Sequence, residues 1–287
     1  MANAATLKPL KPQVRSVAAE ASPPAHAFAM LSHCGRVRHA NQDACAALHD
    51  HGAFVVCDGI GGAAAGDIAS KLAAETFLRA LGHPVAQPRR TSPKVTSGPN
   101  TAQYPASHPH TRLNEAIRAA NQAVFRHSRK SQSLHGMGTT LVAAFLDAAT
   151  DSDTLWLAHV GDSRGYRFRH GTLQLLTEDH SLVEEQVRAG TLSPREAAAS
   201  PLRNIITRAV GSQPTVEPDI AEHTTQPGDL YLLASDGLTR ELADAEIANI
   251  LTRTSVSTLE AACQALIDAA NAHGGRDNIT VLLISCP

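Results

Sequence analysis

The chain has 287 residues, enough for one large domain or two ordinary ones, each with a core that needs no disulfide or metal for stability. Its apolar share of 43% and charged share of 18% are typical of a globular protein, and its low aromatic share of 3% leaves packing to Ala, Leu, Ile and Val. A net charge of -2 gives no general attraction to nucleic acid or to anionic membranes, so we expect neither as a partner.

The N-terminal residues 1–26 carry four prolines and no apolar stretch of signal-peptide length. We therefore expect a disordered N-terminal tail over 1–26, followed by a single folded domain over 27–287. No segment approaches the length of a membrane span. The five cysteines include no CxxC pair and no zinc-finger spacing, a pattern that indicates a reducing, cytoplasmic location.

A second proline-rich segment interrupts the domain at residues 82–112, which hold six prolines, four basic residues and no acid. Apolar residues at helical spacing precede it, over Asp67–Leu81, and follow it from Leu113. This composition predicts a long surface loop inserted between two helices of one domain. An alternative is that the loop is a partner-docking arm that the domain supports.

Strands are predicted where short apolar runs are bounded by turn residues. Many of them follow one another without an intervening helix, which favours antiparallel pairing over repeated βαβ units. The predicted strands are Ala53–Cys57, Thr140–Leu146, Thr154–Val160, Gly165–Arg169, Leu173–Leu176, Asp229–Ala234 and Asn278–Ser285.

Two later helices are indicated by capping-box patterns, one from Ser193 to Glu196 and one from Ser257 to Glu260. The second helix is expected to stop at Gly274–Gly275, because glycine readily adopts a left-handed backbone. Strands with helices in pairs predict an α+β domain whose sheets are covered by helices.

Aspartates follow three of the apolar runs directly or within two residues, namely Asp58, Asp162 and Asp236, and Asp277 precedes the last predicted strand. A single Asp-Gly pair is more often an ordinary turn than a ligand. Four converging carboxylates, however, repel one another unless a cation neutralises them. Oxygen ligands without His or Cys at ligand spacing favour Mg²⁺ or Mn²⁺ over zinc.

The ordered motifs of the chain, from about residue 28 to 286, resemble those of the type 2C metal-dependent Ser/Thr phosphatase family, especially its bacterial branch. Any one motif alone is weak, but eight in the family's order make coincidence very improbable. The matching segments are Gly35–Asp43, Asp58–Gly62 with Ala65–Gly66, Gly138–Thr140, His159–Arg164, Leu176–Ser181, Asn204–Gly211, Ala234–Leu238 and Arg276–Thr280.

The resemblance implies a central antiparallel β-sandwich of two sheets, flanked by helices on both sides, with a flap segment near the cleft. It also implies two core Mn²⁺ or Mg²⁺ ions. Asp58 would bridge them, the Gly59 carbonyl would bind one, and Asp236 and Asp277 would bind the other. Asp162 would help to hold a third, weaker ion.

By the same resemblance Arg38 would bind the substrate phosphate, since its planar fork suits two phosphate oxygens. The expected reaction is attack on phosphoserine or phosphothreonine by a hydroxide that bridges the two metal ions. Asp43 would orient that nucleophile, or it would only cap local backbone. Two positions depart from the family pattern. Ile60 replaces a histidine that donates a proton in many eukaryotic members, and Gln42 replaces a frequently acidic residue.

Residues 178–211 resemble the mobile flap of bacterial members, a segment expected to lie beside the cleft and to influence substrate choice. His159 and His180 lie near the motif acids, but we expect hydrogen-bonded structural roles for both and not metal ligation. The expected partners are phosphorylated proteins, the targets of a Ser/Thr kinase, acted on by a monomer. Alternatives are a catalytically weak regulatory pseudophosphatase and a two-metal hydrolase of small phosphate esters.

Overall fold

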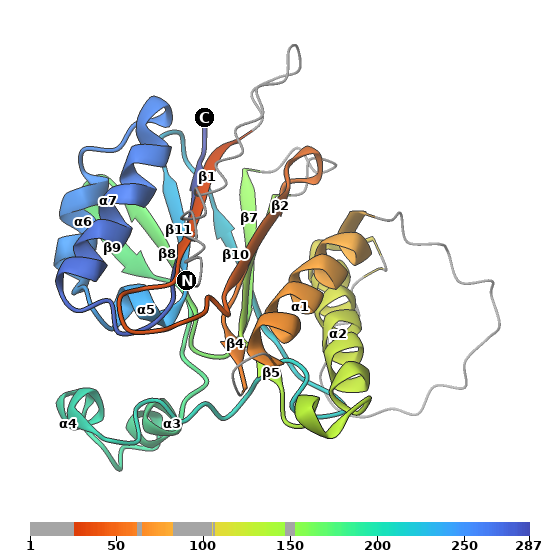
Figure 1. The fold of residues 1–287 in the computed structure, drawn as a ribbon. Helices are drawn as coiled ribbons and strands as arrows, with labels where there is room; N and C mark the ends of the chain where they lie inside the picture. Colours follow the sequence, from red (N-terminus) through yellow and green to blue (C-terminus); the bar gives the residue numbers. More distant parts are fainter. Residues whose placement is uncertain (1–25, 62–64, 83–104, 106, 147–152) are drawn as a thin grey trace, which may run out of the picture.

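The computed structural model describes residues 26–61, 65–82, 105, 107–146 and 153–287. Its core is a pair of five-stranded sheets that pack face to face, with every pairing antiparallel (Figure 1). The first sheet has the order β1 (Ala27–His33), β12 (Ile279–Ser285), β11 (Leu230–Ala234), β8 (Arg164–Arg169) and β9 (Thr172–Leu175). The second sheet has the order β10 (Asp219–Thr224), β7 (Thr154–Val160), β6 (Leu141–Leu146), β3 (Ala53–Cys57) and β2 (Ala44–Leu48).

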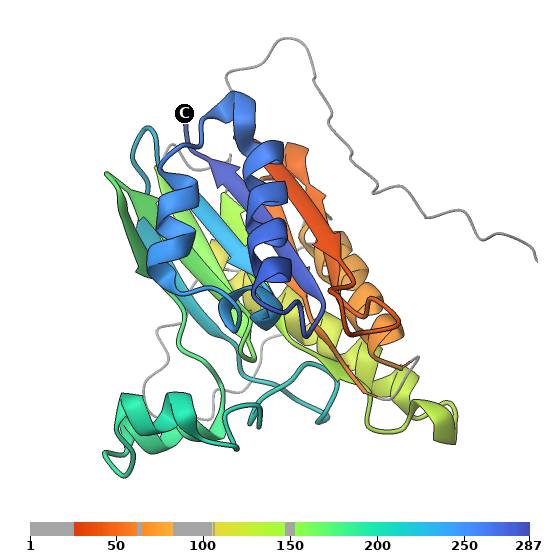
Figure 2. The same cartoon turned by 60° about the vertical axis from the view of Figure 1, so that its left-hand side comes forward.

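Helices cover the outer face of each sheet, so the domain has four layers. α1 (Ala65–Gly82) and α2 (Pro109–Ser128) lie on the second sheet, and α5 (Asp236–Thr239), α6 (Asp244–Leu251) and α7 (Leu259–Ala272) lie on the first. α3 (Leu182–Arg188) and α4 (Pro194–Ala199) lie apart from both layers (Figure 2). A short two-stranded ladder joins β4 (Gly59–Ile60) to β5 (Gly138–Thr139). The predicted helix-covered antiparallel sandwich is confirmed.

Alternation along the strands explains the layering, although the strands read as unbroken apolar runs. In β3, Phe54 and Val56 join the cluster between the sheets, whereas Val55 and Cys57 face α1 and α2. β11 divides in the same way. Tyr231 and Leu233 point toward the other sheet, whereas Leu230, Leu232 and Ala234 face the helices. Successive strand residues point to opposite faces, and here both faces are dry.

The predicted loop over 82–112 is wrong at its C-terminal end. α2 begins at Pro109, four residues earlier than expected, with His108 as the capping residue, whose Nδ1 accepts from the His110 N–H at 3.3 Å. Proline at the first helical position has the required φ and lacks only an N–H that would have no helical partner. Residues 83–104 and 106 of that prediction, and 1–25 of the predicted tail, lie outside the described residues.

The two capping-box predictions had different outcomes. The Ser193 box is present, with the hydroxyl accepting from the Glu196 N–H and the Glu196 carboxylate accepting from the Ser193 N–H. The Ser257 box is wrong, because a 3₁₀ turn over Val256–Thr258 precedes α7, and the Ser255 N–H donates to the Thr258 hydroxyl at 2.7 Å. The stop after α7 is confirmed at Gly274 and Gly275, with φ of 144° and 54°.

Candidate active site

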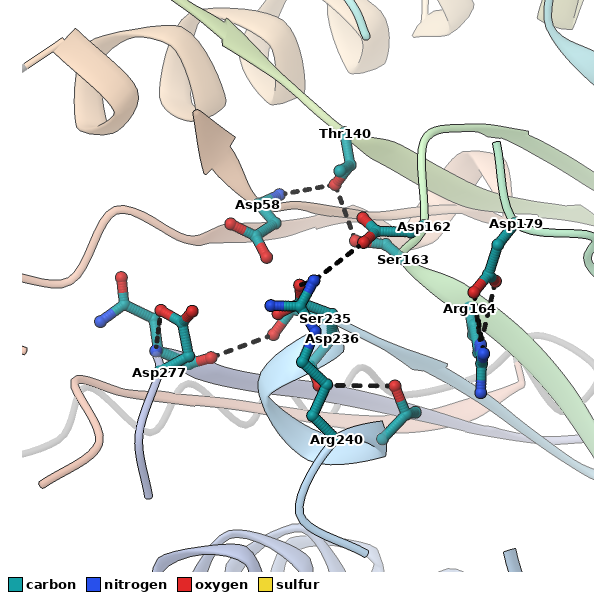
Figure 3. Close-up of polar contacts among 12 residues, drawn as sticks. Asp58, Thr140, Asp162, Ser163, Arg164, Asp179, Ser235, Asp236, Arg240 and Asp277 are labelled. Atoms are coloured by element: carbon teal, nitrogen blue, oxygen red, sulfur yellow. Dashed lines mark hydrogen bonds and ion pairs between the residues drawn. The ribbon is translucent and has the colours of Figure 1, made fainter. Parts of the chain in front are cut away.

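The sheet topology brings the four predicted strand-end acids to one rim of the sandwich. β3 and β7 both pair antiparallel with β6, so they run in the same direction and Asp58 and Asp162 follow them at the same edge. β11 ends just before Asp236, and its antiparallel partner β12 begins just after Asp277. Figure 3 shows the four carboxylates gathered where the two sheets meet.

Glycines in the two Asp-Gly pairs are required by close packing. A Cβ on Gly59 would lie 2.3 Å from the carbonyl oxygen of Gly66, and one on Gly237 would lie 2.0 Å from that of Asn278. Neither contact is sterically possible. The Asp-Gly pairs therefore mark places where one backbone lies directly against another, and this fixes the preceding aspartate.

The backbone of Asp58 is held by the threonines of the Gly138–Thr140 motif. Thr139 Oγ1 and the Thr140 N–H both donate to the Asp58 carbonyl, at 2.8 and 2.9 Å, and the Asp58 N–H donates to Thr140 Oγ1 at 2.9 Å. Thr140 Oγ1 is also 2.7 Å from Ser163 Oγ, the residue after Asp162. This network couples the positions of two acids that come from different strands (Figure 3).

Asp43 is buried beneath the rim, where it accepts hydrogen bonds from two hydroxyls of the other sheet. Its Oδ2 lies 2.8 Å from Ser235 Oγ and 2.7 Å from Thr280 Oγ1. Burial raises the pKa of Asp43 to about 6, although both hydroxyls oppose that rise. These contacts join Asp43 to side chains of the other sheet, so its carboxylate does more than cap local backbone.

The rim acids are close enough to disfavour one another's ionised forms. Burial raises the pKa of Asp58, and the charges of Asp43 and Asp236 raise it further. Burial, followed by the neighbouring Asp162, raises the pKa of Asp236 to about 8. Within the described part of the chain, Oδ1 of Asp43, Asp162 and Asp236 is buried without a hydrogen-bond partner. Unpaired buried carboxylate oxygens are costly, and they are the atoms that a hard cation binds.

Arg38 lies on the loop between β1 and β2 and reaches the rim from outside. Its Nη2 is 2.7 Å from Asp277 Oδ2, and its side chain remains 53% exposed. Asn278 holds this loop, because its Nδ2 donates to the carbonyls of Cys34 and Ala40 and its Oδ1 accepts from the Gln42 N–H at 2.8 Å.

A cleft of about 780 Å³ opens beside the acids. One wall is formed by Arg38, Asp162, Asp236 and Asp277, and the other by residues of the segment 178–211, which contains α3 and α4. Near the start of this segment, Asp179 forms an ion pair with Arg164, whose Nε and Nη2 donate to its two carboxylate oxygens at 2.9 and 2.8 Å. The predicted flap therefore lies beside the acid cluster.

His159, His180 and Asp219 form a second polar cluster, between β7, β10 and the start of the flap. Nδ1 of His180 accepts from the Gly161 N–H at 3.1 Å, so the neutral ring carries its proton on Nε2, 3.2 Å from Asp219 Oδ2. Metal binding at that Nε2 would displace the proton and leave an imidazolate, whereas a ligating histidine normally keeps an N–H on its other nitrogen. The cluster has the chemistry of a hydrogen-bonded anchor.

Several supporting side chains were not singled out from the sequence. All but Arg240 lie inside a quoted motif, and Arg240 lies two residues after one, so their position in the sequence was the signal. No local pattern indicates which acid each of them contacts. They are Thr139, Thr140, Ser163, Ser235, Arg240, Asn278 and Thr280.

Comparison with known proteins shows the family of the chain. The family model for protein phosphatase 2C matches residues 32–272. A serine/threonine phosphatase stp of Listeria monocytogenes is 38% identical over 253 residues, which span 87% of this chain and 92% of that protein.

Solved structures match over a similar length. The Streptococcus agalactiae serine/threonine phosphatase superposes with a TM-score of 0.77 at 34% identity, covering 91% of this chain and all of that one. The catalytic domain of PstP, solved in complex with two manganese ions, gives a TM-score of 0.72 at 32% identity, covering 91% of this chain and 97% of that one. The chain therefore belongs to the protein phosphatase 2C family.

Proposed function

We propose that the protein is a metal-dependent serine/threonine phosphatase that hydrolyses phosphoserine and phosphothreonine in proteins. The observation that carries this proposal is the cluster of under-neutralised carboxylates at the mouth of a cleft that also holds a partly free arginine. The names of the relatives, serine/threonine phosphatases from several bacteria, support the same activity.

The acids of the rim fit two divalent ions. Buried carboxylate oxygens without hydrogen-bond partners, together with raised pKa values, indicate a donor set that a cation would neutralise. Asp58, the Gly59 carbonyl, Asp236 and Asp277 would hold the two core ions. When bound, the ions would polarise the phosphoryl group and acidify a water molecule. The manganese ions in PstP make Mn²⁺ the first ion to test.

Arg38 is assigned to hold the phosphate. The ion pair with Asp277 engages its Nη2, and the exposed remainder of the fork can donate to two phosphate oxygens. Asp43 is assigned to orient the attacking water, since its Oδ2 is fixed by Ser235 and Thr280 while its Oδ1 has no hydrogen-bond partner within the described residues. Ile60 cannot donate a proton, so the leaving oxygen takes its proton from solvent or from another group.

We also propose how the chain is divided, in what form it acts, and where. Residues 1–26 are proposed as a tail and 27–287 as the catalytic domain, acting as a monomer on the targets of a Ser/Thr kinase. Among the helices that the structure describes, none is long and apolar enough to cross a membrane. All five cysteines are free, and this supports a cytoplasmic location.

The test is hydrolysis of phosphoserine and phosphothreonine peptides by purified protein with Mn²⁺, with and without excess chelator. Asp58→Asn is expected to abolish the activity, and Asp50→Asn, which removes an exposed acid in the turn before β3, to preserve it. Full activity in excess chelator would refute the metal-dependent mechanism. Turnover of a small aryl phosphate but of no peptide would favour a hydrolase of small esters, and no turnover of either would favour a pseudophosphatase.

A further inference from the structure

Arg240 is placed directly over the rim by the short helix α5. Its N–H donates to the Asp236 carbonyl at 2.8 Å, which closes the single turn that starts at Asp236. Side chains on a helix lean toward its N-terminus, so a residue four positions after Asp236 covers it. The side chain of Arg240 therefore returns toward the acids and does not extend into solvent.

The guanidinium joins carboxylates that belong to different sheets. Arg240 Nη2 is 3.1 Å from Asp162 Oδ2, at the end of β7, and forms an ion pair with Asp236 Oδ2, at the end of β11 (Figure 3). The side chains of the two acids are only 6% and 10% exposed, whereas that of Arg240 is 30% exposed. One nitrogen of Arg240 thus occupies the point where a cation shared by these two acids would lie.

This arrangement conflicts with a readily filled third metal position at Asp162. An ion there would need carboxylate oxygens that Arg240 already neutralises, and it would have to displace a charge that is covalently attached to the chain. A tethered cation needs no association from solution, so it competes at a high effective concentration. The same contact leaves the set formed by Asp58, Asp236 and Asp277 with oxygens for two core ions.

We propose that Arg240 is a positioning residue that serves as a built-in cation between Asp162 and Asp236. It holds the two sheets' acids in register and competes with any third ion for the carboxylate oxygens of Asp162. The inference rests on the proposed metal-dependent function, and it concerns the ion count and not the reaction.

The experiment counts Mn²⁺ ions by equilibrium dialysis and measures their affinities by titration calorimetry. The variants are Arg240→Gln, Arg240→Lys and the double variant Asp162→Asn with Arg240→Gln. We expect wild type to bind two ions tightly and a third weakly. Arg240→Gln should tighten the third ion by about tenfold or more, since it removes a competing charge at contact distance. The double variant should lose that gain.

Arg276→Gln is the matched control. Arg276 also lines the cleft, but it pairs with Glu241 at 3.1 Å, so its removal takes a positive charge from the cleft without touching Asp162. An equal gain in that variant would mean that only the general field of the cleft is involved, and would overturn the proposal. Arg240→Lys keeps the charge on a shorter stem and should fall between wild type and Arg240→Gln.

The outcomes separate the two proposals. Two tight ions in wild type, with third-ion affinity unchanged in both Arg240 variants, would refute the role of Arg240 and leave the phosphatase assignment intact. Absence of any tight ion in wild type would refute the metal-dependent function itself. If Arg240→Gln does not fold, Arg240→Met, which removes the charge and keeps most of the bulk, replaces it, and a third-ion affinity equal to that of wild type contradicts the proposal.

Discussion

The two ends of strand β11 carry the same residue type in opposite circumstances. Asp229, just before the strand, is 1% exposed and receives the Arg169 fork, with Nε at 2.6 Å and Nη2 at 2.5 Å from its oxygens. Asp236, two residues after the strand, is 7% exposed, shares the single guanidinium of Arg240 with Asp162, and lies among other acids. Burial raises the pKa of Asp229, but the hydrogen bonds from Arg169 and from the Gln226 N–H, together with the charges of Arg169 and Arg167, outweigh burial and lower that pKa. At Asp236, burial and the neighbouring Asp162 raise the pKa to about 8.

This difference separates a structural acid from a functional one. A buried carboxylate that is fully bonded by an arginine fork holds two strands together and needs nothing more. A cluster with more acids than cations lowers the stability of the empty fold and creates an affinity for cations. Perturbed pKa values of this kind are concentrated at functional sites. The two ends should therefore respond in opposite ways to the same substitutions.

The largest expected effect is on catalysis. Asp236→Asn should lower the rate of phosphopeptide hydrolysis by about 10³-fold, because losing a proposed metal ligand would remove several kcal/mol of transition-state stabilisation. Its unfolding free energy in chelator should not fall, since one repelling charge is gone. Asp229→Asn is the matched variant and should keep its activity while losing stability. The same pattern in both variants would remove the distinction between the two ends.

The next effect is on stability at the paired end. Arg169→Gln leaves Asp229 buried without its cation, which should reduce the free energy of unfolding by about 3 kcal/mol in urea titration. Arg167→Gln, on the same strand, is the control, because Arg167 makes an exposed hydrogen bond to Gln174 and its loss should cost less than about 0.5 kcal/mol. Equal losses of unfolding free energy in the two variants would show that the buried Arg169 fork stabilises the fold no more than an exposed hydrogen bond does.

An effect that is smaller per pH unit should appear as pH dependence of the metal-free protein. The folded pKa of Asp236 is raised, so between about pH 4 and pH 8 the folded chain holds a proton that the unfolded chain has lost. Stability in chelator should therefore fall as pH rises through this window, by up to about 1.4 kcal/mol per pH unit per proton. Asp229 has the opposite sign, and its contribution should be lost only as the pH falls below about 4. Mn²⁺ should remove the decline at higher pH, and a decline that Mn²⁺ does not change would contradict the assignment.

The smallest expected effect concerns Asp43. Ser235→Ala removes one of the two hydroxyls that donate to its Oδ2 and should reduce the hydrolysis rate by about tenfold, the lower end of what one hydrogen bond to a charged group contributes. The Mn²⁺ count should stay unchanged. Loss of a bound ion in this variant would mean that the hydroxyl acts on the metal ligands and not on the orienting acid.

Much of the fold could be predicted because buried strands carry an unmistakable apolar signal. The segment Thr154–Val160 was predicted with its observed bounds. Strand β10 was missed because it is an edge strand in which Glu222 and other residues are exposed, so it has little apolar character. Strand β2 was missed as well, since no residue of its alanine-rich sequence is fully buried.

The site could be predicted to the level of its acids but not of its contacts. Aspartates at strand ends are visible in the sequence, whereas convergence depends on which strands are neighbours. The Arg38 pair with Asp277 spans 239 positions, and the Arg240 pair with Asp162 spans 78. Contacts at such separations follow from the order of strands in the sheets and from the helical turn of α5. Local sequence patterns predict neither of these.

The most direct test of the account is to strip the protein of metal and measure phosphoserine-peptide hydrolysis as Mn²⁺ is added back in known amounts. We expect no hydrolysis in chelator and a hydrolysis rate that rises until two Mn²⁺ ions are bound per chain. Hydrolysis at the full rate in the stripped protein would contradict the proposal that Asp236 and the other rim acids hold catalytic ions.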